Sequence, residues 1–108
     1  MLPVRLRPVA LEELAQAWGW YESRREGLGD EFRACVDVGI AAIARTPLGC
    51  AEVRGDARRK VLRRFPYALI YLVEPEHVEV VAIFHTSREP VAWEERVRSR
   101  STGADPSG

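Results

Sequence analysis

The chain has 108 residues, 46% of them hydrophobic and 30% charged, and its formal net charge at pH 7 is +0. This length suits one domain with one core, and the composition excludes a fibrous or low-complexity protein. No apolar run reaches the roughly 18 residues that span a bilayer, and the start lacks a signal peptide, so a cytoplasmic protein without membrane contact is expected.

The N-terminal part predicts a short strand and then a helix. Residues 4–7 alternate apolar and polar side chains, which is the period of a half-buried strand. From Val9 to about Arg25, apolar residues recur at spacings of three and four, which predicts one buried stripe on a helix. The stripe comprises Leu11, Leu14, Ala15, Trp18 and Tyr21. Core packing is expected for Trp18, Trp20 and Tyr21.

A second helix is predicted after the break at residues 27–29. Asp30 is the expected N-cap, because its carboxylate can accept a free N–H group at a helix start. The apolar stripe of this helix comprises Phe32, Val36, Ile40 and Ile43. Thr46-Pro47 ends it, since a residue before proline avoids the α region. So short a break between two helices predicts an antiparallel helical hairpin.

The second half of the chain predicts three strands. After a charged connection over residues 48–58, a basic strand is expected over 60–65. Residues 67–73 are rich in aromatic and β-branched side chains, and residues 78–84 are nearly all apolar, which favours a central strand covered on both faces. The turn between them at 74–76 is short, so these strands should be antiparallel.

The elements predict an α+β fold with the order β-α-α-β-β-β(-α). The helical hairpin should pack on one face of a small antiparallel sheet, and arginines of the basic strand should gather on the other face. A short final helix over 91–97 would place Trp93 on the sheet. We expect a single domain over residues 1–98 and a disordered tail over 99–108, which is small and polar.

Although the net charge is zero, the charged residues are distributed unevenly along the chain. Between residues 54 and 64 the only acid is Asp56, and the basic residues are Arg54, Arg58, Arg59, Lys60, Arg63 and Arg64. Residues 9–31 are instead rich in acids. A basic segment of this kind suits an acidic protein partner or a nucleic acid, but it also suits a solvated strand edge that resists aggregation. The pattern alone leaves both interpretations open.

Nothing in the sequence indicates a metal or a cofactor. Cys35 and Cys50 have neither metal-binding nor redox spacing, and two reduced thiols fit a cytoplasmic protein. His77 and His85 lack a matching set of ligands, and there is no glycine-rich phosphate loop. We therefore expect no cofactor.

The strand motifs, in their order, resemble those of a known family. The segment RFPYALIY at residues 64–71 is followed, one hairpin later, by VAIFHTSR at 81–88 and then by Trp93. With the helix start at 29–32 and the Thr46-Pro47 stop, the chain from about residue 4 to residue 96 is similar to the RelE/ParE superfamily of type II toxins. These proteins are also described as plasmid stabilisation proteins.

The resemblance implies a bacterial growth inhibitor that a cognate antitoxin keeps silent. Acidic and apolar residues of such an antitoxin would suit the basic segment. The residues expected to bind a partner or a nucleic acid are Arg58, Arg59, Lys60, Arg63, Arg64, Arg88 and Trp93. One branch of the superfamily cuts mRNA on the ribosome, and the other poisons DNA gyrase without hydrolysis.

In a RelE-like nuclease, His85 would act as acid or base, with Arg63, Arg64 and Arg88 holding the phosphate and Tyr71 positioning a base. The sequence departs from that branch. Ala68 stands where the cleaving enzymes carry a catalytic arginine, and no tyrosine follows His85. The resemblance is therefore closer to the ParE branch, with gyrase as the implied target. A member that only binds its antitoxin is a further alternative.

Overall fold

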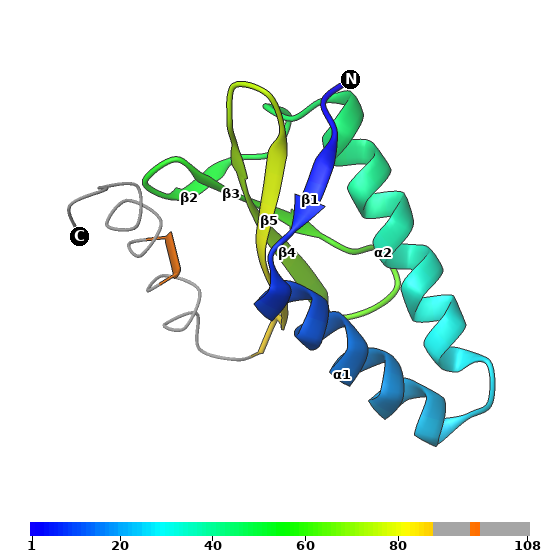
Figure 1. The fold of residues 1–108 in the computed structure, drawn as a ribbon. Helices are drawn as coiled ribbons and strands as arrows, with labels where there is room; N and C mark the ends of the chain where they lie inside the picture. Colours follow the sequence, from blue (N-terminus) through cyan, green and yellow to red (C-terminus); the bar gives the residue numbers. More distant parts are fainter. Residues whose placement is uncertain (88–95, 98–108) are drawn as a thin grey trace.

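The computed structural model describes residues 1–87 and 96–97 (Figure 1). Its elements are β1 (Val4–Leu6), α1 (Pro8–Arg24), α2 (Leu28–Arg45), β2 (Glu52–Arg54), β3 (Ala57–Val61), β4 (Tyr67–Val73) and β5 (Val78–His85). The predicted α+β class is confirmed. Neither α1 nor α2, the two helices of the described part, has an apolar stretch of the length a bilayer crossing requires.

Several predicted features fall outside the described residues. They are Arg88, Trp93, the tail over 99–108 and the final helix over 91–97 apart from Arg96 and Val97. The predictions made for them, and for the end of the domain at residue 98, therefore stay predictions.

The strands form one sheet in the order β1-β5-β4-β3-β2. The predicted antiparallel pairing of the last strands is confirmed, because β4 pairs antiparallel with both β3 and β5. β1 differs: it pairs parallel with β5, with Val4 opposite Val78, so the sheet is mixed. β2 lies in the segment predicted as a connection, and it pairs antiparallel with β3 through a turn in which Gly55 has a φ of 58°.

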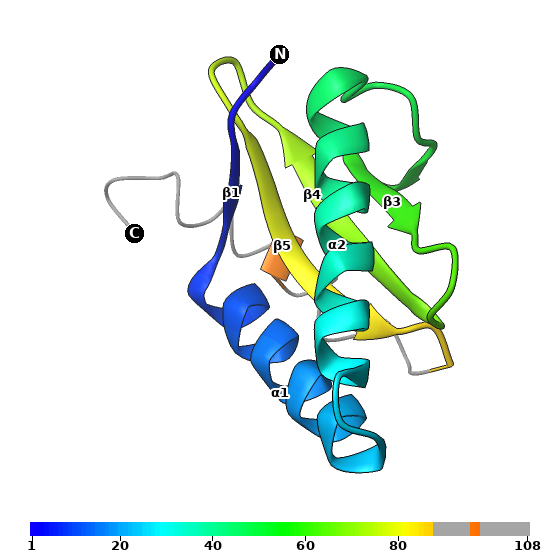
Figure 2. The same cartoon turned by 90° about the vertical axis from the view of Figure 1, so that its right-hand side faces the viewer.

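The helical hairpin packs on one face of this sheet, as predicted, and its connecting end projects beyond the strands (Figures 1 and 2). Gly27 has a φ of 89°, which glycine adopts without strain, and it forms the N-cap of α2. Asp30 is therefore not the cap. The carboxylate of Glu22 in α1 instead accepts the N–H groups of Gly27 and Gly29, each at 2.9 Å.

The buried face of α1 is rotated from the predicted stripe. Its buried residues are Ala10, Leu14, Ala17 and Tyr21. Leu11, Trp18 and Trp20 are 51%, 38% and 52% exposed, so the expected core packing holds for Tyr21 but not for the two tryptophans. Trp18 instead donates its indole N–H to Asp30 at 3.0 Å. The sequence spacing fits both faces, and contact with the sheet selects one of them.

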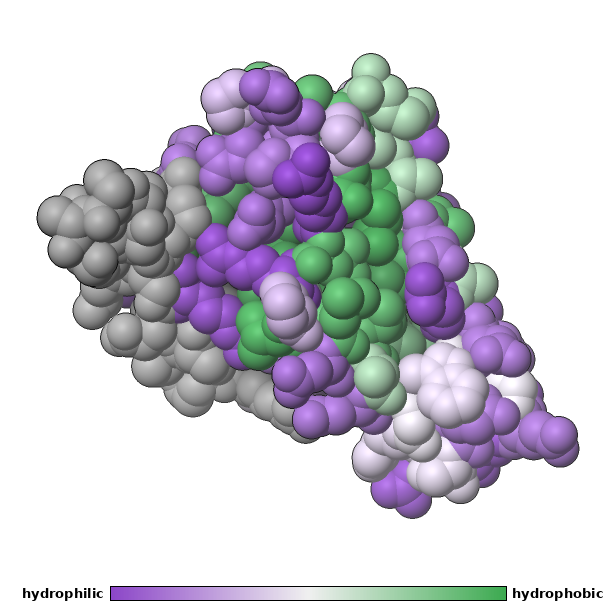
Figure 3. All heavy atoms as spheres, viewed as in Figure 1, coloured by the Kyte–Doolittle hydropathy of each residue, from purple (hydrophilic) through white to green (hydrophobic). Residues whose placement is uncertain are grey.

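The core occupies both faces of the sheet. On the helix side, Tyr71, Val80 and Ile83 pack with residues of α1 and α2, and on the other side Ile70, Leu72 and Val81 pack with Val97. The prediction that residues 78–84 form a central strand covered on both faces is confirmed. On the face seen in Figure 3, hydrophobic residues gather in the middle, whereas the projecting end of the hairpin is hydrophilic or near neutral.

Candidate partner-binding groove

The basic segment folds differently from the strand predicted over 60–65. β3 ends at Val61, and residues 62–66 form a turn that leads into β4. Leu62 and Phe65 are buried and anchor this turn to the core. The turn is closed by hydrogen bonds from the Leu62 N–H to the Tyr67 carbonyl at 2.9 Å and from the Tyr67 N–H to the Phe65 carbonyl at 2.7 Å. Arg63 and Arg64 are thereby left exposed between two buried anchors.

The arginines do not gather on the face of the sheet opposite the helices, so that expectation is wrong. Successive strand residues point to opposite faces. Arg58 therefore turns to the helix side, where its guanidinium donates to the Cys50 carbonyl after the end of α2, and Lys60 lines a groove beside α2. Arg59 lies on the other face, 5.9 Å from the centroid of the Phe84 ring.

Two of the predicted binding residues are held by contacts within the chain. Arg58 has a second partner in Glu52 at 3.6 Å, so this side chain fixes the loop before β2. Arg64 reaches from the turn to Glu31 on α2, and their charged atoms lie 2.8 Å apart. The hydrogen bonds from Arg64 and then from Arg25 keep the pKa of the Glu31 carboxyl below its ordinary value.

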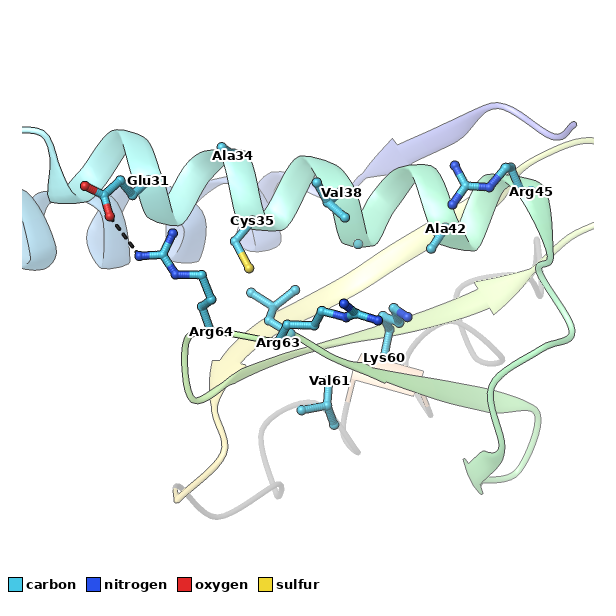
Figure 4. A pocket seen from close by; sticks show the side chains of 12 residues that line it. Glu31, Ala34, Cys35, Val38, Ala42, Arg45, Lys60, Val61, Arg63 and Arg64 are labelled. Carbon is cyan, nitrogen blue, oxygen red and sulfur yellow. Dashed lines mark hydrogen bonds and ion pairs between the residues drawn. The ribbon is translucent and has the colours of Figure 1, made fainter.

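A groove of about 500 Å³ runs between α2 and the segment from β3 into the turn (Figure 4). Ala34, Cys35, Val38, Gly39 and Ala42 form its helix side, together with Glu31 and Arg45 at the two ends. The opposite side is formed by Lys60, Val61, Leu62, Arg63 and Arg64. Figure 4 shows Cys35 and Ala42 facing the strand and Arg64 reaching Glu31, while Val61 points away from the helix.

The groove combines an apolar floor with a basic rim. Val38 is 65% exposed and lies beside Ala34, Cys35 and Ala42 in the groove lining, so these side chains together form an apolar surface that can be buried on binding. The cations Arg45, Lys60, Arg63 and Arg64 surround this floor, and Glu31 is already paired with Arg64. Such a surface suits a peptide segment that carries both apolar and acidic side chains.

The helix side of this groove contains none of the residues predicted from the sequence to bind a partner. Ala34, Val38 and Ala42 recur every four residues, and they lie on a different face from the buried stripe of Phe32, Val36 and Ile43. In the sequence, the signal for this side of the groove is a second apolar stripe on the same helix. The first stripe alone accounts for packing on the sheet, so the second stripe was not assigned a role.

Of the residues proposed for RNA cleavage, Arg88 lies outside the described residues, while Arg64, His85 and Tyr71 each have partners within the chain. His85 ends β5 and contacts the Tyr67 ring, with centroids 5.3 Å apart, and its Nδ1 accepts the N–H of Ser87 at 3.1 Å. Tyr71 is fully buried, donates its hydroxyl to the Pro47 carbonyl at 2.8 Å, and has its pKa raised by burial. Tyr71 therefore cannot position a base.

The comparison with protein families decides the classification. Residues 4–90 match the family described as "ParE toxin of type II toxin-antitoxin system, parDE". The chain belongs to this ParE toxin family. The match covers β1 to β5 and includes the whole groove, so the ParE toxin fold and the groove come from the same residues.

A solved structure shares the fold of this chain. It is described as the "Chromosomal ParDE TA system from P. aeruginosa", with a TM-score of 0.69 and 14% sequence identity to this ParE toxin. The match covers 79% of this chain and 96% of that one. None of the curated proteins compared with the sequence is similar to it.

Proposed function

We propose that this ParE toxin is neutralised by a cognate antitoxin whose amphipathic, acidic segment binds in the groove between α2 and the 60–64 segment. The observation that carries the proposal is the apolar floor of the groove, where Val38 is 65% exposed, within a rim of Arg45, Lys60, Arg63 and Arg64. Burial of the floor would supply affinity, and the rim would attract acidic side chains and set the register.

The groove is best tested by charge reversal on its rim. The double variant Lys60→Glu/Arg63→Glu should bind the antitoxin encoded beside the toxin gene about 10- to 100-fold more weakly, because two favourable charge contacts become repulsive. Isothermal titration or surface binding at two salt concentrations measures the loss, and the wild-type complex should be the more salt-sensitive. Neither side chain belongs to the buried core, so the fold should persist.

A control on another surface is the single charge reversal Arg5→Glu on β1. Arg5 is exposed and lies outside the groove lining, so its reversal changes the net charge without touching the proposed site. It should leave the antitoxin affinity within about twofold of wild type, as is usual for a distant surface charge. Equal losses from both variants, or no loss from the groove variant, would reject the groove as the antitoxin site.

The proposed target of the free toxin is DNA gyrase. This target is supported by membership of the ParE family and by the burial of Tyr71, whose hydroxyl is bonded to the Pro47 carbonyl and is not available to position a base as a nuclease would need. Expression without antitoxin should trap gyrase–DNA cleavage complexes and induce the SOS response. The variant His85→Ala should remain toxic.

The alternatives give different outcomes in the same assay. Codon-positioned cuts in mRNA, detected by primer extension and lost in His85→Ala, would identify a RelE-like nuclease instead. Normal colony formation during expression, with antitoxin binding intact, would identify a member that only binds its antitoxin. Toxicity without cleavage complexes or an SOS response would reject gyrase as the target.

A further inference from the structure

The two ends of the groove between α2 and the 60–64 segment differ in charge. Its helix side runs from Glu31 to Arg45, which is about 21 Å at the rise of an α-helix. Figure 4 shows Arg64 beside Glu31 at one end of the groove, and Lys60 toward the end where Arg45 lies. In the same view the Arg63 side chain points toward Lys60. We call these two regions the Glu31 end and the Lys60 end.

The Lys60 end carries cations that no side chain of the described residues neutralises. Arg45, Lys60 and Arg63 all line the groove, and none of them takes part in an ion pair within this part of the chain. Arg45 and Arg63 are exposed, and Lys60 is half-buried. Three positive charges without an internal counter-charge attract the carboxylates of a partner. Acidic residues of a bound segment are therefore most favourable at this end.

At the Glu31 end, the positive charge already has a partner. Arg64 Nη2 lies 2.8 Å from Glu31 Oε1, and Arg25 Nη2 lies 3.1 Å from Glu31 Oε2. Because hydrogen bonds from both arginines keep the pKa of the Glu31 carboxyl below its ordinary value, this group is ionised at neutral pH. Within the groove lining, the charges of Glu31 and Arg64 cancel. A partner carboxylate at this end would meet a like charge and would compete with Glu31 for Arg64.

The middle of the groove is apolar and narrow. A Cβ atom on Gly39 would lie 3.0 Å from Leu62 Cδ2, so α2 and the 60–64 segment approach each other closely at this point. Val38 is exposed beside Gly39 and offers apolar surface to a partner. A bound segment therefore crosses an uncharged middle, and its two ends meet different charges.

We propose that Glu31 fixes the direction in which a partner segment binds, with the acidic residues of the segment at the Lys60 end and its uncharged, apolar residues at the Glu31 end. The inference rests on the proposed function, because it concerns the same groove and the same kind of partner. It adds that the acids of the partner cluster at one end of the bound segment. Glu31 is then a specificity-determining residue, which acts by repelling carboxylates and by holding Arg64.

The proposal is tested on the full-length chain with a twelve-residue peptide as the probe. The peptide carries three glutamates at its N-terminal end, leucine, alanine and serine at the remaining positions, and a nitroxide attached through a thioether at its C-terminal end. In two-dimensional NMR, the nitroxide should broaden the amide signals of Glu31 and Ala34 more than those of Ala42 and Arg45. In Glu31→Gln the two pairs should be broadened to a similar extent, because acids are no longer excluded from either end.

Neutral variants of single cations measure the difference between the two ends. Lys60→Gln and Arg45→Gln should each weaken the peptide about two- to fivefold, which is the range for an exposed ion pair. Arg64→Gln should cost less than Lys60→Gln, because Glu31 already holds that charge. In the Glu31→Gln background, however, the two losses should become equal, and this non-additivity is the sign of coupling. Arg5→Gln is the matched control, since it removes one exposed positive charge outside the groove.

Several results would overturn the proposal. They are equal broadening at both ends in the wild type, equal losses from Arg64→Gln and Lys60→Gln, the absence of saturable shifts in the groove, or the same direction for a peptide with glutamines in place of the glutamates. If Glu31→Gln fails to fold, the comparison of Arg64→Gln with Lys60→Gln decides the outcome.

The failure of this proposal differs from the failure of the proposed function. Weak antitoxin binding by Lys60→Glu/Arg63→Glu, together with no preferred direction of the peptide, would reject only the role of Glu31. A preferred direction of the peptide, together with unchanged antitoxin binding by that double variant, would reject the groove as the antitoxin site and support the role of Glu31.

Discussion

Glu13 of α1 and Arg96 form a bidentate ion pair, in which Arg96 Nη1 lies 3.0 Å from Glu13 Oε1 and Arg96 Nη2 lies 2.9 Å from Glu13 Oε2. The same Oε1 accepts the N–H of Ile83 at 3.0 Å, and Arg96 Nη1 donates to the Val81 carbonyl at 3.1 Å. β1 pairs with β5 as far as Val80. Beyond this point, the two side chains provide partners for the backbone groups of β5.

This arrangement predicts that Glu13→Gln lowers the free energy of unfolding by about 1 to 3 kcal/mol, because Arg96 loses its charged partner at a site that is mostly shielded from water. The side chains of Arg96 and Glu13 are 20% and 25% exposed. Urea unfolding followed by circular dichroism measures the change. The neighbouring Glu12→Gln is the control, and its effect should stay within about 0.5 kcal/mol. Equal effects of the two variants would contradict a structural role for the pair.

Gly29 allows α1 and α2 to approach closely, and a methyl group there should destabilise the hairpin. A Cβ atom on Gly29 would lie 2.8 Å from the Trp18 carbonyl oxygen, which belongs to the backbone and cannot swing aside. Gly29→Ala should cost about 1 to 3 kcal/mol, as overpacking usually does. At Gly19 a Cβ would meet nothing within 4 Å, so Gly19→Ala should stabilise the helix by about 0.5 to 1 kcal/mol. Thermal melts of both variants should therefore shift in opposite directions.

The lowered pKa of the Glu79 carboxyl should make the fold less stable in acid. Burial raises the pKa of its carboxyl, but hydrogen bonds from Arg7 and His77 outweigh burial and leave the pKa below its ordinary value of 4.5. A group whose pKa is lowered by folding stabilises the protein above its unfolded pKa, and this contribution is lost as the pH falls through the folded value. Glu79→Gln should cost about 1 kcal/mol at pH 7.

The test is a series of urea titrations between neutral pH and pH 3. The difference in unfolding free energy between wild type and Glu79→Gln should shrink as the pH drops below about 4.5, the ordinary carboxyl value. Glu76→Gln in the adjacent turn is the control, since Glu76 is exposed. A difference that stays constant over this range would show that the Glu79 charge does not contribute.

A hydrogen bond from Tyr71 of β4 connects the loop after α2 to the sheet. Its hydroxyl donates to the Pro47 carbonyl at 2.8 Å, although the side chain is fully buried. Tyr71→Phe should lower the unfolding free energy by about 1 to 2 kcal/mol, because the carbonyl loses its donor while the ring keeps its packing. Burial raises the pKa of the Tyr71 phenol and also that of Tyr21, so the ultraviolet titration of the wild type should contain two tyrosines that ionise above pH 10, of which the variant keeps only one. If the signal lost in the variant instead ionises near pH 10, the ordinary tyrosine value, the hydroxyl is in water.

Much of the fold could be predicted because its signals are local. The spacing of apolar residues, the Thr46-Pro47 stop and the turn at 74–76 each act within a few residues, and α2, β4 and β5 follow them closely. β2 was missed because its three residues are all exposed, so no buried face gives them a strand period. The parallel pairing of β1 depends on residues more than 70 positions away.

The candidate site was predicted in its composition but not in its geometry. The cluster of basic residues and the expectation of an acidic partner follow from the sequence alone. The direction of each side chain does not. Arg58 and Arg59 point to opposite faces because they are neighbours in a strand, and Arg63 and Arg64 leave the sheet because Leu62 and Phe65 are drawn into the core.

The sequence by itself determined the helices, most of the strands and the family resemblance, since these rest on periodicity, on turn residues and on motifs that are continuous in the chain. The tertiary structure decided which face of α1 is buried, where the groove lies, and that His85 contacts the Tyr67 ring. Side-chain surroundings are set by the register of pairing between distant segments, and no local pattern in the chain encodes that register.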